Sequence, residues 1–347
     1  MFRELYRCGE DLAMLEVLRI NLCSPLSLAF VLGLVSRLFR SELSLPRELY
    51  ASLSIYLLLA LGLKGGVELS HSTPGDLIWP ALVTIALGCI TPVTSYLALR
   101  RLGRFSIADA AGIAAHYGSV SAVTFIAAQQ FVQTLGFPAE GYMPTLLTLL
   151  ESPGIHIALG IGAVQTARVA ARQNSGTHGD SAARPLSEVL HEVLTARSMI
   201  LLVGGLICGC IMGSQGYEPV KPFFEGMFKG ALTLFLLEMG LSAGARLGDL
   251  KTAGPFLLGF GMLMPVLHGL FGVVLGHWAG LSIGGATVLG TMAASASYIA
   301  APPAVRMTLP EANPTLYLTA ALAITFPFNI VVGIPLYFQM AKMLGGN

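Results

Sequence analysis

The sequence predicts an all-α polytopic membrane protein in which ten transmembrane helices form two inverted five-helix repeats, with helices four and nine broken. Charged residues make up 11% of the chain, whereas soluble domains contain about 25%. Hydrophobic residues make up 54%, and the mean hydropathy is +0.72. A soluble protein of 347 residues would need more polar surface, so we expect the lipid bilayer to be the main solvent.

Ten apolar runs approach or exceed the length of about 20 residues that a spanning helix needs. They are 22–39, 48–63, 77–99, 107–135, 143–170, 198–214, 221–243, 254–277, 282–307 and 315–342. A hydrophilic linker at 172–197 separates a first five-helix repeat, 21–171, from a second, 198–347. An odd number of spans in each repeat forces the second to be inverted relative to the first, which is typical of transporters.

The ends and loops of the chain predict its orientation. Residues 1–20 mix charged and apolar residues, which favours an amphipathic segment on the membrane surface over a cleaved signal. Most of the 20 basic residues fall in cytoplasmic loops when both termini are placed outside. The positive-inside rule therefore predicts outside termini and a cytoplasmic linker, in the inner (plasma) membrane of the cell.

Composition and motifs also exclude several classes of function. The net charge of +1 argues against nucleic acid as a partner, because such proteins carry a basic surface. The sequence contains neither a glycine-rich phosphate loop before a helix nor an HExxH motif. We therefore expect a carrier and not an enzyme, with no cofactor other than a coupling ion.

A pair of serines occurs in each of two membrane-length runs. Ser119 and Ser121 lie in the run 107–135, and Ser295 and Ser297 occupy the equivalent positions of the run 282–307. Pro302 and Pro303 follow the second pair and cannot continue a regular helix. Unwound backbone at membrane depth must be satisfied by protein or by a water-filled cavity. We therefore expect broken helices at both serine pairs.

Two broken helices that meet would present helix N-termini to one point. Backbone amides and the positive dipole ends suit a small anion there, with serine hydroxyls as further donors. Freed carbonyls could coordinate sodium near Ser121 and Ser297. The alternative is that small residues only allow close helix packing. The matching of the two pairs, each beside a helix breaker, favours a binding site.

Other polar residues within the spans are candidates for coupling or gating, because ionisable groups in a membrane are costly. They are His116, Tyr117, Tyr298, Glu238 and Asn329. His116 would contact the solute or carry a proton, and Glu238 is the best-placed carboxylate. Pro153 and Pro327 are expected to interrupt spans five and ten, and Asn329 to satisfy the broken backbone of span ten.

Several motifs carry a resemblance to a known family. Residues 295–303 read Ser-Ala-Ser-Tyr-Ile-Ala-Ala-Pro-Pro, and residues 309–314 read Leu-Pro-Glu-Ala-Asn-Pro. Residues 62–66 read Gly-Leu-Lys-Gly-Gly, and residues 265–269 read Pro-Val-Leu-His-Gly. With these motifs the chain resembles the sodium-dependent bicarbonate transporter superfamily, best known from cyanobacterial bicarbonate uptake proteins.

The resemblance implies a homotrimer of ten-span protomers that hold bicarbonate where the two broken helices cross, with sodium nearby. The residues that match the family's binding positions are Gly118, Ser119, Ser121, Ser295, Ala296 and Ser297. The chain departs from cyanobacterial members at Tyr298, where they carry an aspartate, and at Leu241 and Ser242, where they carry a glutamate. The family also suggests a PII-like cytosolic regulator, although the linker here is short.

Three functions follow from these observations. The leading prediction is secondary active transport of a small anion, most plainly bicarbonate, inward with sodium. The second is a proton-coupled carrier of another small anion or carboxylate on the same scaffold, with His116 carrying the proton. The third is a passive channel or facilitator, which needs no coupling ion.

Overall fold

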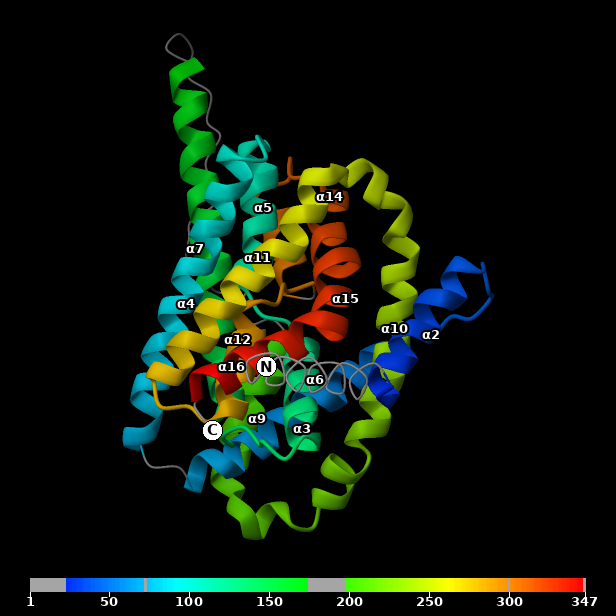
Figure 1. The fold of residues 1–347 in the computed structure, drawn as a ribbon, viewed down its shortest axis with the longest axis vertical. Coiled ribbons are helices and arrows are strands. Elements are labelled where there is room, and N and C mark those ends of the chain that lie inside the picture. Colours follow the sequence, from blue (N-terminus) through cyan, green and yellow to red (C-terminus); the bar gives the residue numbers. More distant parts are fainter. Residues whose placement is uncertain (1–22, 72–73, 174–196, 299, 346–347) are drawn as a thin grey trace, which may run out of the picture.

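A computed structural model describes residues 23–71, 74–173, 197–298 and 300–345 (Figure 1). Within these ranges the chain is helical, without a strand. Its elements are α2 (Pro25–Leu38), α3 (Arg47–His71), α4 (Pro74–Arg101), α5 (Ile107–Gly118), α6 (Ala122–Thr134), α7 (Met143–Gln173), α9 (Arg197–Tyr217), η1 (Pro222–Gly226), α10 (Phe228–Arg246), η2 (Leu247–Asp249), α11 (Leu250–Trp278), α12 (Ile283–Ala293), α13 (Ala301–Thr308), α14 (Pro314–Leu318), η3 (Thr319–Thr325), α15 (Phe326–Phe328), η4 (Asn329–Gly333) and α16 (Ile334–Gly345). The predicted amphipathic segment 1–20 and linker residues 174–196 lie outside the described residues.

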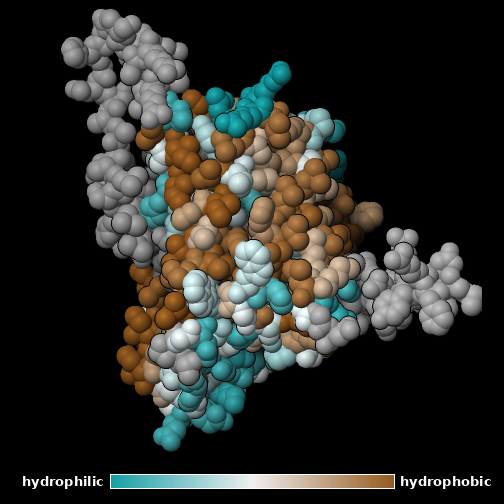
Figure 2. Space-filling view, turned by 60° about the vertical axis from the view of Figure 1, so that its left-hand side comes forward, coloured by the Kyte–Doolittle hydropathy of each residue, from teal (hydrophilic) through white to brown (hydrophobic). Residues whose placement is uncertain are grey.

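The described residues include seven helical stretches that are long and apolar enough to cross a membrane. They are Glu48–His71, Gly75–Arg101, Ile107–Thr134, Met143–Thr166, Phe228–Asp249, Ala253–Trp278 and Pro314–Gly345. Hydrophobic side chains cover the middle of the face shown in Figure 2, and hydrophilic ones gather toward its upper and lower ends. The protein is therefore a multi-pass membrane protein, whereas the count of ten spans in inverted repeats stays a prediction.

The chain leaves the helical conformation at both serine pairs. Residues 119–121 separate α5 from α6, and the described residues between α12 and α13 are equally non-helical. Pro302 lies in the first turn of α13, where its missing N–H has no intrahelical partner in any case. The break in the second run therefore precedes the proline pair, which begins α13 and does not end α12.

The expected break at Pro153 is wrong, because α7 runs through this residue as a continuous α-helix. A membrane helix accommodates proline when its neighbours satisfy the freed backbone groups. Pro327 lies in α15, a short α-helical turn between the π-helical segments η3 and η4. The interruption of the last span is therefore a change of helix type rather than a loop.

Two helix pairs make the most extensive contacts in the molecule, α3 with α9 and α2 with α10. Both pairs approach through glycines. A Cβ atom on Gly33 of α2 would overlap the carbonyl oxygen of Leu237 in α10, and one on Gly209 of α9 would overlap the carbonyl oxygen of Leu63 in α3. Small residues at such interfaces let helix backbones approach closely within a membrane.

The remaining helices surround the two breaks. Helices α4, α5 and α7 pack together, as do α11, α12 and α16. In Figure 1, α5 and α14 lie toward the upper end of the molecule, and α3 and α6 lie toward the lower end. The serine breaks lie between these ends, in the interior of the bundle.

Candidate functional site

The two serine breaks contact each other directly in the core. The backbone N–H of Ser121 donates to Ser295 Oγ at 2.9 Å, and the backbone N–H of Ser297 donates to the carbonyl oxygen of His116 at 2.8 Å. Ser121 Oγ donates to the phenol oxygen of Tyr298 at 3.4 Å. The structure therefore brings together serines that lie far apart in the sequence.

Ser121 and Ser297 hold equivalent positions at the start of a helical segment. Ser121 Oγ accepts the backbone N–H of Thr124 at 3.2 Å and caps α6. Ser297 Oγ accepts the backbone N–H of Ala300 at 3.3 Å, just before α13. A serine at such a position satisfies one of the N–H groups that lack intrahelical partners. Each hydroxyl keeps its own proton as a donor.

Ser295 and Ser119 are equivalent in sequence but not in their hydrogen bonds. Ser295 Oγ donates to the carbonyl oxygen of Met292 at 2.8 Å and accepts from Ser121. Ser119 Oγ is buried without a hydrogen-bond partner among the described residues, and the residue is 2% exposed. A buried polar group without a partner costs about 1–3 kcal/mol. A ligand that accepts a hydrogen bond from Ser119 would recover this energy.

The backbone around Ser119 adds further donors. The first N–H groups of α6 follow directly after Ser121 and lack carbonyl acceptors within the helix. They stand at the positive end of the helix dipole, in a place that is nearly free of exposed surface. Such an N-terminus attracts a small anion.

Gly118 and Ala296 contribute packing rather than polar side chains. A Cβ atom on Gly118 would lie 2.7 Å from the Cβ atom of Pro92 and 3.0 Å from the Cα atom of Gly154. Ala296 is 3% exposed and belongs to the apolar core around α5 and α13. The absence of a side chain at Gly118 therefore allows the end of α5 to approach α4 and α7 closely.

His116 is fully buried in the last turn of α5. Its Nδ1 atom lies 2.7 Å from the carbonyl oxygen of Gly112, which assigns the ring proton to Nδ1. The ring stacks on Tyr317, with centroids 4.6 Å apart. Nε2 then remains an acceptor without a partner among the described residues. His116 therefore retains one free hydrogen-bonding position.

Tyr117 and Tyr298 have different surroundings. The Tyr117 hydroxyl lies 2.5 Å from Thr325 Oγ1, which itself donates to the carbonyl oxygen of Gly261 at 2.7 Å. Tyr117 thus links α5 to η3 and α11, away from the serines. Tyr298 contacts Ser121 through its hydroxyl and packs edge-on against Phe326 at 5.4 Å. Of the two, Tyr298 is the one that contacts a serine pair.

Asn329 supports the second break instead of its own helix, which corrects the expectation from the sequence. Its Nδ2 atom donates to the carbonyl oxygen of Ala294 at 2.8 Å, so it satisfies a backbone group freed at the end of α12. Its Oδ1 atom accepts from the hydroxyl of Tyr337 at 3.0 Å. Sequence reasoning missed Tyr337, because no local pattern marks a tyrosine eight residues away as a support.

Glu238 is not brought to the serines by any hydrogen bond among the described residues. It lies on α10, where its Oε1 atom accepts from Ser242 Oγ at 3.4 Å. Within the described parts of the chain no cluster of three or more His, Cys, Asp or Glu residues could hold a metal ion.

Comparison with known proteins identifies the family of the chain. The chain matches no curated protein. The family described as the Na+-dependent bicarbonate transporter superfamily matches residues 25–342. This match extends from the first residue of α2 into α16 and includes both serine breaks. The chain belongs to the Na+-dependent bicarbonate transporter superfamily.

Proposed function

We propose that the protein is a secondary active transporter that carries bicarbonate inward together with sodium. The observation that carries this proposal is the buried contact between the two serine breaks, in which Ser119 Oγ has no partner among the described residues. Membership of a bicarbonate transporter superfamily supports the choice of substrate.

The chemistry of the breaks suits a bicarbonate ion. Bicarbonate offers three oxygens as acceptors, and the hydroxyl of Ser119 and the first N–H groups of α6 are the matching donors. Sodium would bind to the freed carbonyls and to the hydroxyls of Ser121 and Ser297, as coupling ions do at unwound transporter helices. Tyr298 would supply a neutral oxygen beside Ser121.

The helix contacts support the inverted repeat that this mechanism uses. In such a repeat α2 corresponds to α9, and α3 corresponds to α10. Exchanging the two repeats therefore converts the contact between α2 and α10 into the contact between α9 and α3. These are the two most extensive contacts among the described helices, and both are made through glycines. We extend the proposal to ten spans, both termini outside the inner membrane, and a homotrimer. Solute binding between two repeats is characteristic of such carriers.

Uptake of labelled bicarbonate into proteoliposomes tests the proposal. A sodium gradient should drive accumulation above the outside concentration, and removing the gradient should abolish accumulation. Uptake that follows a pH gradient and ignores sodium would favour the proton-coupled carrier, for which the free Nε2 atom of His116 is the supporting observation. Downhill flux without accumulation under either gradient would instead identify a passive facilitator.

A further inference from the structure

The interior of the bundle contains an acidic side chain to which the proposed function gives no role. Glu151 of α7 is 5% exposed, and it is the only Asp or Glu among the described residues that is buried. It belongs to the candidate membrane span Met143–Thr166. An ionisable group within a span is costly to bury, and such groups mark ion pathways. The burial of Glu151 therefore points to a function.

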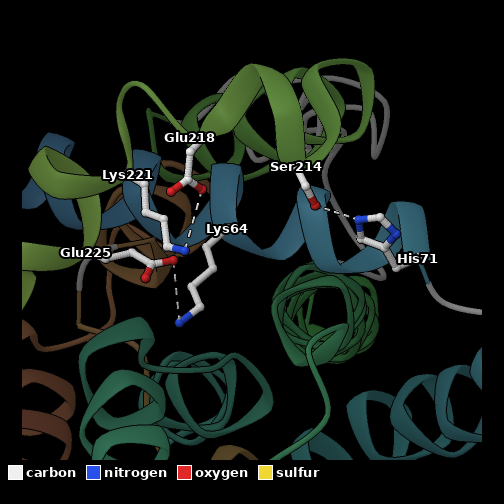
Figure 3. Close-up of polar contacts among 6 residues, drawn as sticks. All are labelled: Lys64, His71, Ser214, Glu218, Lys221 and Glu225. Carbon is white, nitrogen blue, oxygen red and sulfur yellow. Dashed lines mark hydrogen bonds and ion pairs between the residues drawn. The ribbon is translucent and has the colours of Figure 1, made fainter.

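The acidic residues beside α3 show the more usual arrangement. Glu225 lies 4.0 Å from Nζ of Lys64, and Glu218 lies 3.6 Å from Nζ of Lys221 (Figure 3). Each of these four side chains is at least 34% exposed, so both ion pairs are solvated surface contacts. Glu151 differs from them because its carboxylate lies in the core.

Helix α7 packs along α5 and carries Glu151 past the end of that helix. A Cβ atom on Gly162 of α7 would lie 2.7 Å from the Cβ atom of Ala111. A Cβ atom on Gly154 would overlap the carbonyl oxygen of Gly118, the last residue of α5. The two helices therefore run antiparallel. Glu151 lies three residues before Gly154, or about 4.5 Å along α7, which places it beside the first serine break.

Glu151 also lies on the face of α7 that packs into the core. Leu147, Ile155 and Ala158 are fully buried, and they lie four residues before, four after and seven after Glu151. Residues at these spacings share one face of an α-helix. Gly154 lies three residues from Glu151 and contacts the end of α5. The carboxylate thus belongs to the face that meets the broken helix.

The end of α5 offers further oxygen atoms at this level. The last carbonyl groups of an α-helix lack intrahelical donors and form the negative end of its dipole. The carbonyl oxygen of His116 accepts the N–H of Ser297, whereas the carbonyl oxygen of Gly118 lies against Gly154 of α7. Carbonyl oxygens at the C-terminal ends of half-helices coordinate sodium in transporters. A carboxylate beside them adds the negative charge that a cation requires.

We propose that Glu151 is the charged ligand of the coupling sodium ion, which it holds beside the first serine break together with backbone carbonyls at the end of α5. The anion binds across the break, at the positive end of α6. Sodium neutralises Glu151 and removes its repulsion of the anion, so each ion favours binding of the other. The identity of the anion as bicarbonate rests on the proposed function, whereas sodium binding at Glu151 does not.

Equilibrium binding of radioactive sodium to the purified full-length protein tests this site without requiring transport. Glu151→Gln keeps the size of the side chain and removes its charge. It should raise the sodium concentration for half-saturation at least about tenfold, because the ion loses its charged partner. Glu238→Gln is the matched comparison, since Glu238 also lies in a candidate span but accepts from Ser242 and the backbone of Leu45. It should leave sodium binding unchanged.

A third variant separates charge from packing. Glu151→Asp keeps the carboxylate and shortens the side chain, so it should bind sodium more tightly than Glu151→Gln. Thermal unfolding in sodium chloride and in choline chloride of equal ionic strength gives a second readout, because a ligand that binds the folded state raises the unfolding temperature. Sodium should produce this rise in the wild type and in Glu238→Gln, and the rise should disappear in Glu151→Gln.

Three results would overturn the sodium site. They are a wild-type protein that binds no sodium, a Glu151→Gln protein that binds sodium as the wild type does, and equally weak binding by the Asp and Gln variants, which would indicate a packing role. Sodium binding that depends on Glu151, without sodium-driven accumulation of bicarbonate, would count against the proposed function alone. Sodium-driven accumulation that survives Glu151→Gln would count against Glu151 alone.

Discussion

Replacing the two equivalent serines, Ser119 and Ser295, with alanine should change the stability of the protein differently. Ser119→Ala should impair transport without lowering stability. Ser119 Oγ has no partner among the described residues, so Ser119→Ala removes a buried unsatisfied hydroxyl. We expect its thermal stability to equal that of the wild type or to exceed it. Ser295→Ala removes the acceptor of the Ser121 N–H. It strands a buried donor, which costs about 1–3 kcal/mol.

Transport by Ser119→Ala should decrease even though its stability does not. A hydrogen bond to a charged group contributes about 1.5–3 kcal/mol, which corresponds to a decrease of about 10- to 150-fold in kcat/KM for bicarbonate uptake. The assay pairs initial uptake rates in proteoliposomes with thermal unfolding of the same purified variants. Uptake by Ser119→Ala within about twofold of the wild type would refute the assignment of the free hydroxyl to the anion. Equal destabilisation of both variants would refute the difference between the two serines.

Three further substitutions test the supports of the site. Asn329→Leu should lower the free energy of unfolding by about 2 kcal/mol or more, because it strands the carbonyl oxygen of Ala294; an unchanged unfolding temperature would contradict this role. Tyr298→Asp should lower the sodium concentration for half-maximal uptake, because a carboxylate beside Ser121 is a better sodium ligand than a phenol; an unchanged sodium response would count against a sodium site there. Gly33→Ala should weaken the α2–α10 pair and lower the unfolding temperature, whereas Gly230→Ala, with open space around its Cβ position, should not; size-exclusion and thermal unfolding compare the two.

The breaks themselves could be predicted because their causes are local. Small residues surround both serine pairs, and the proline pair after the second one favours the start of a new helix over the continuation of the old one. Pro153 shows the limit of such reasoning. The same residue type breaks a helix only if its neighbours leave the freed carbonyl unsatisfied, and α7 continues through Pro153.

The hydrogen bonds within the site could not be predicted, because they depend on tertiary contacts. Ser119 and Ser295 have similar neighbours in sequence, yet only Ser295 receives the N–H of Ser121. Asn329 reaches the carbonyl oxygen of Ala294 across 35 residues of chain. Glu238 was the best-placed carboxylate by sequence, but it accepts hydrogen bonds from Ser242 on its own helix and from the backbone of Leu45. Helix packing decides each of these cases.

The most direct test of the central claim is to locate bound bicarbonate by solid-state nuclear magnetic resonance. Isotope-labelled bicarbonate is added, with sodium, to the protein labelled at its backbone nitrogens. We predict magnetisation transfer from bicarbonate carbon to the backbone nitrogens of Ser119 and Ala122, and loss of this transfer with Ser119→Ala. Transfer to other parts of the chain without any to these two nitrogens would contradict an anion site at the serine breaks.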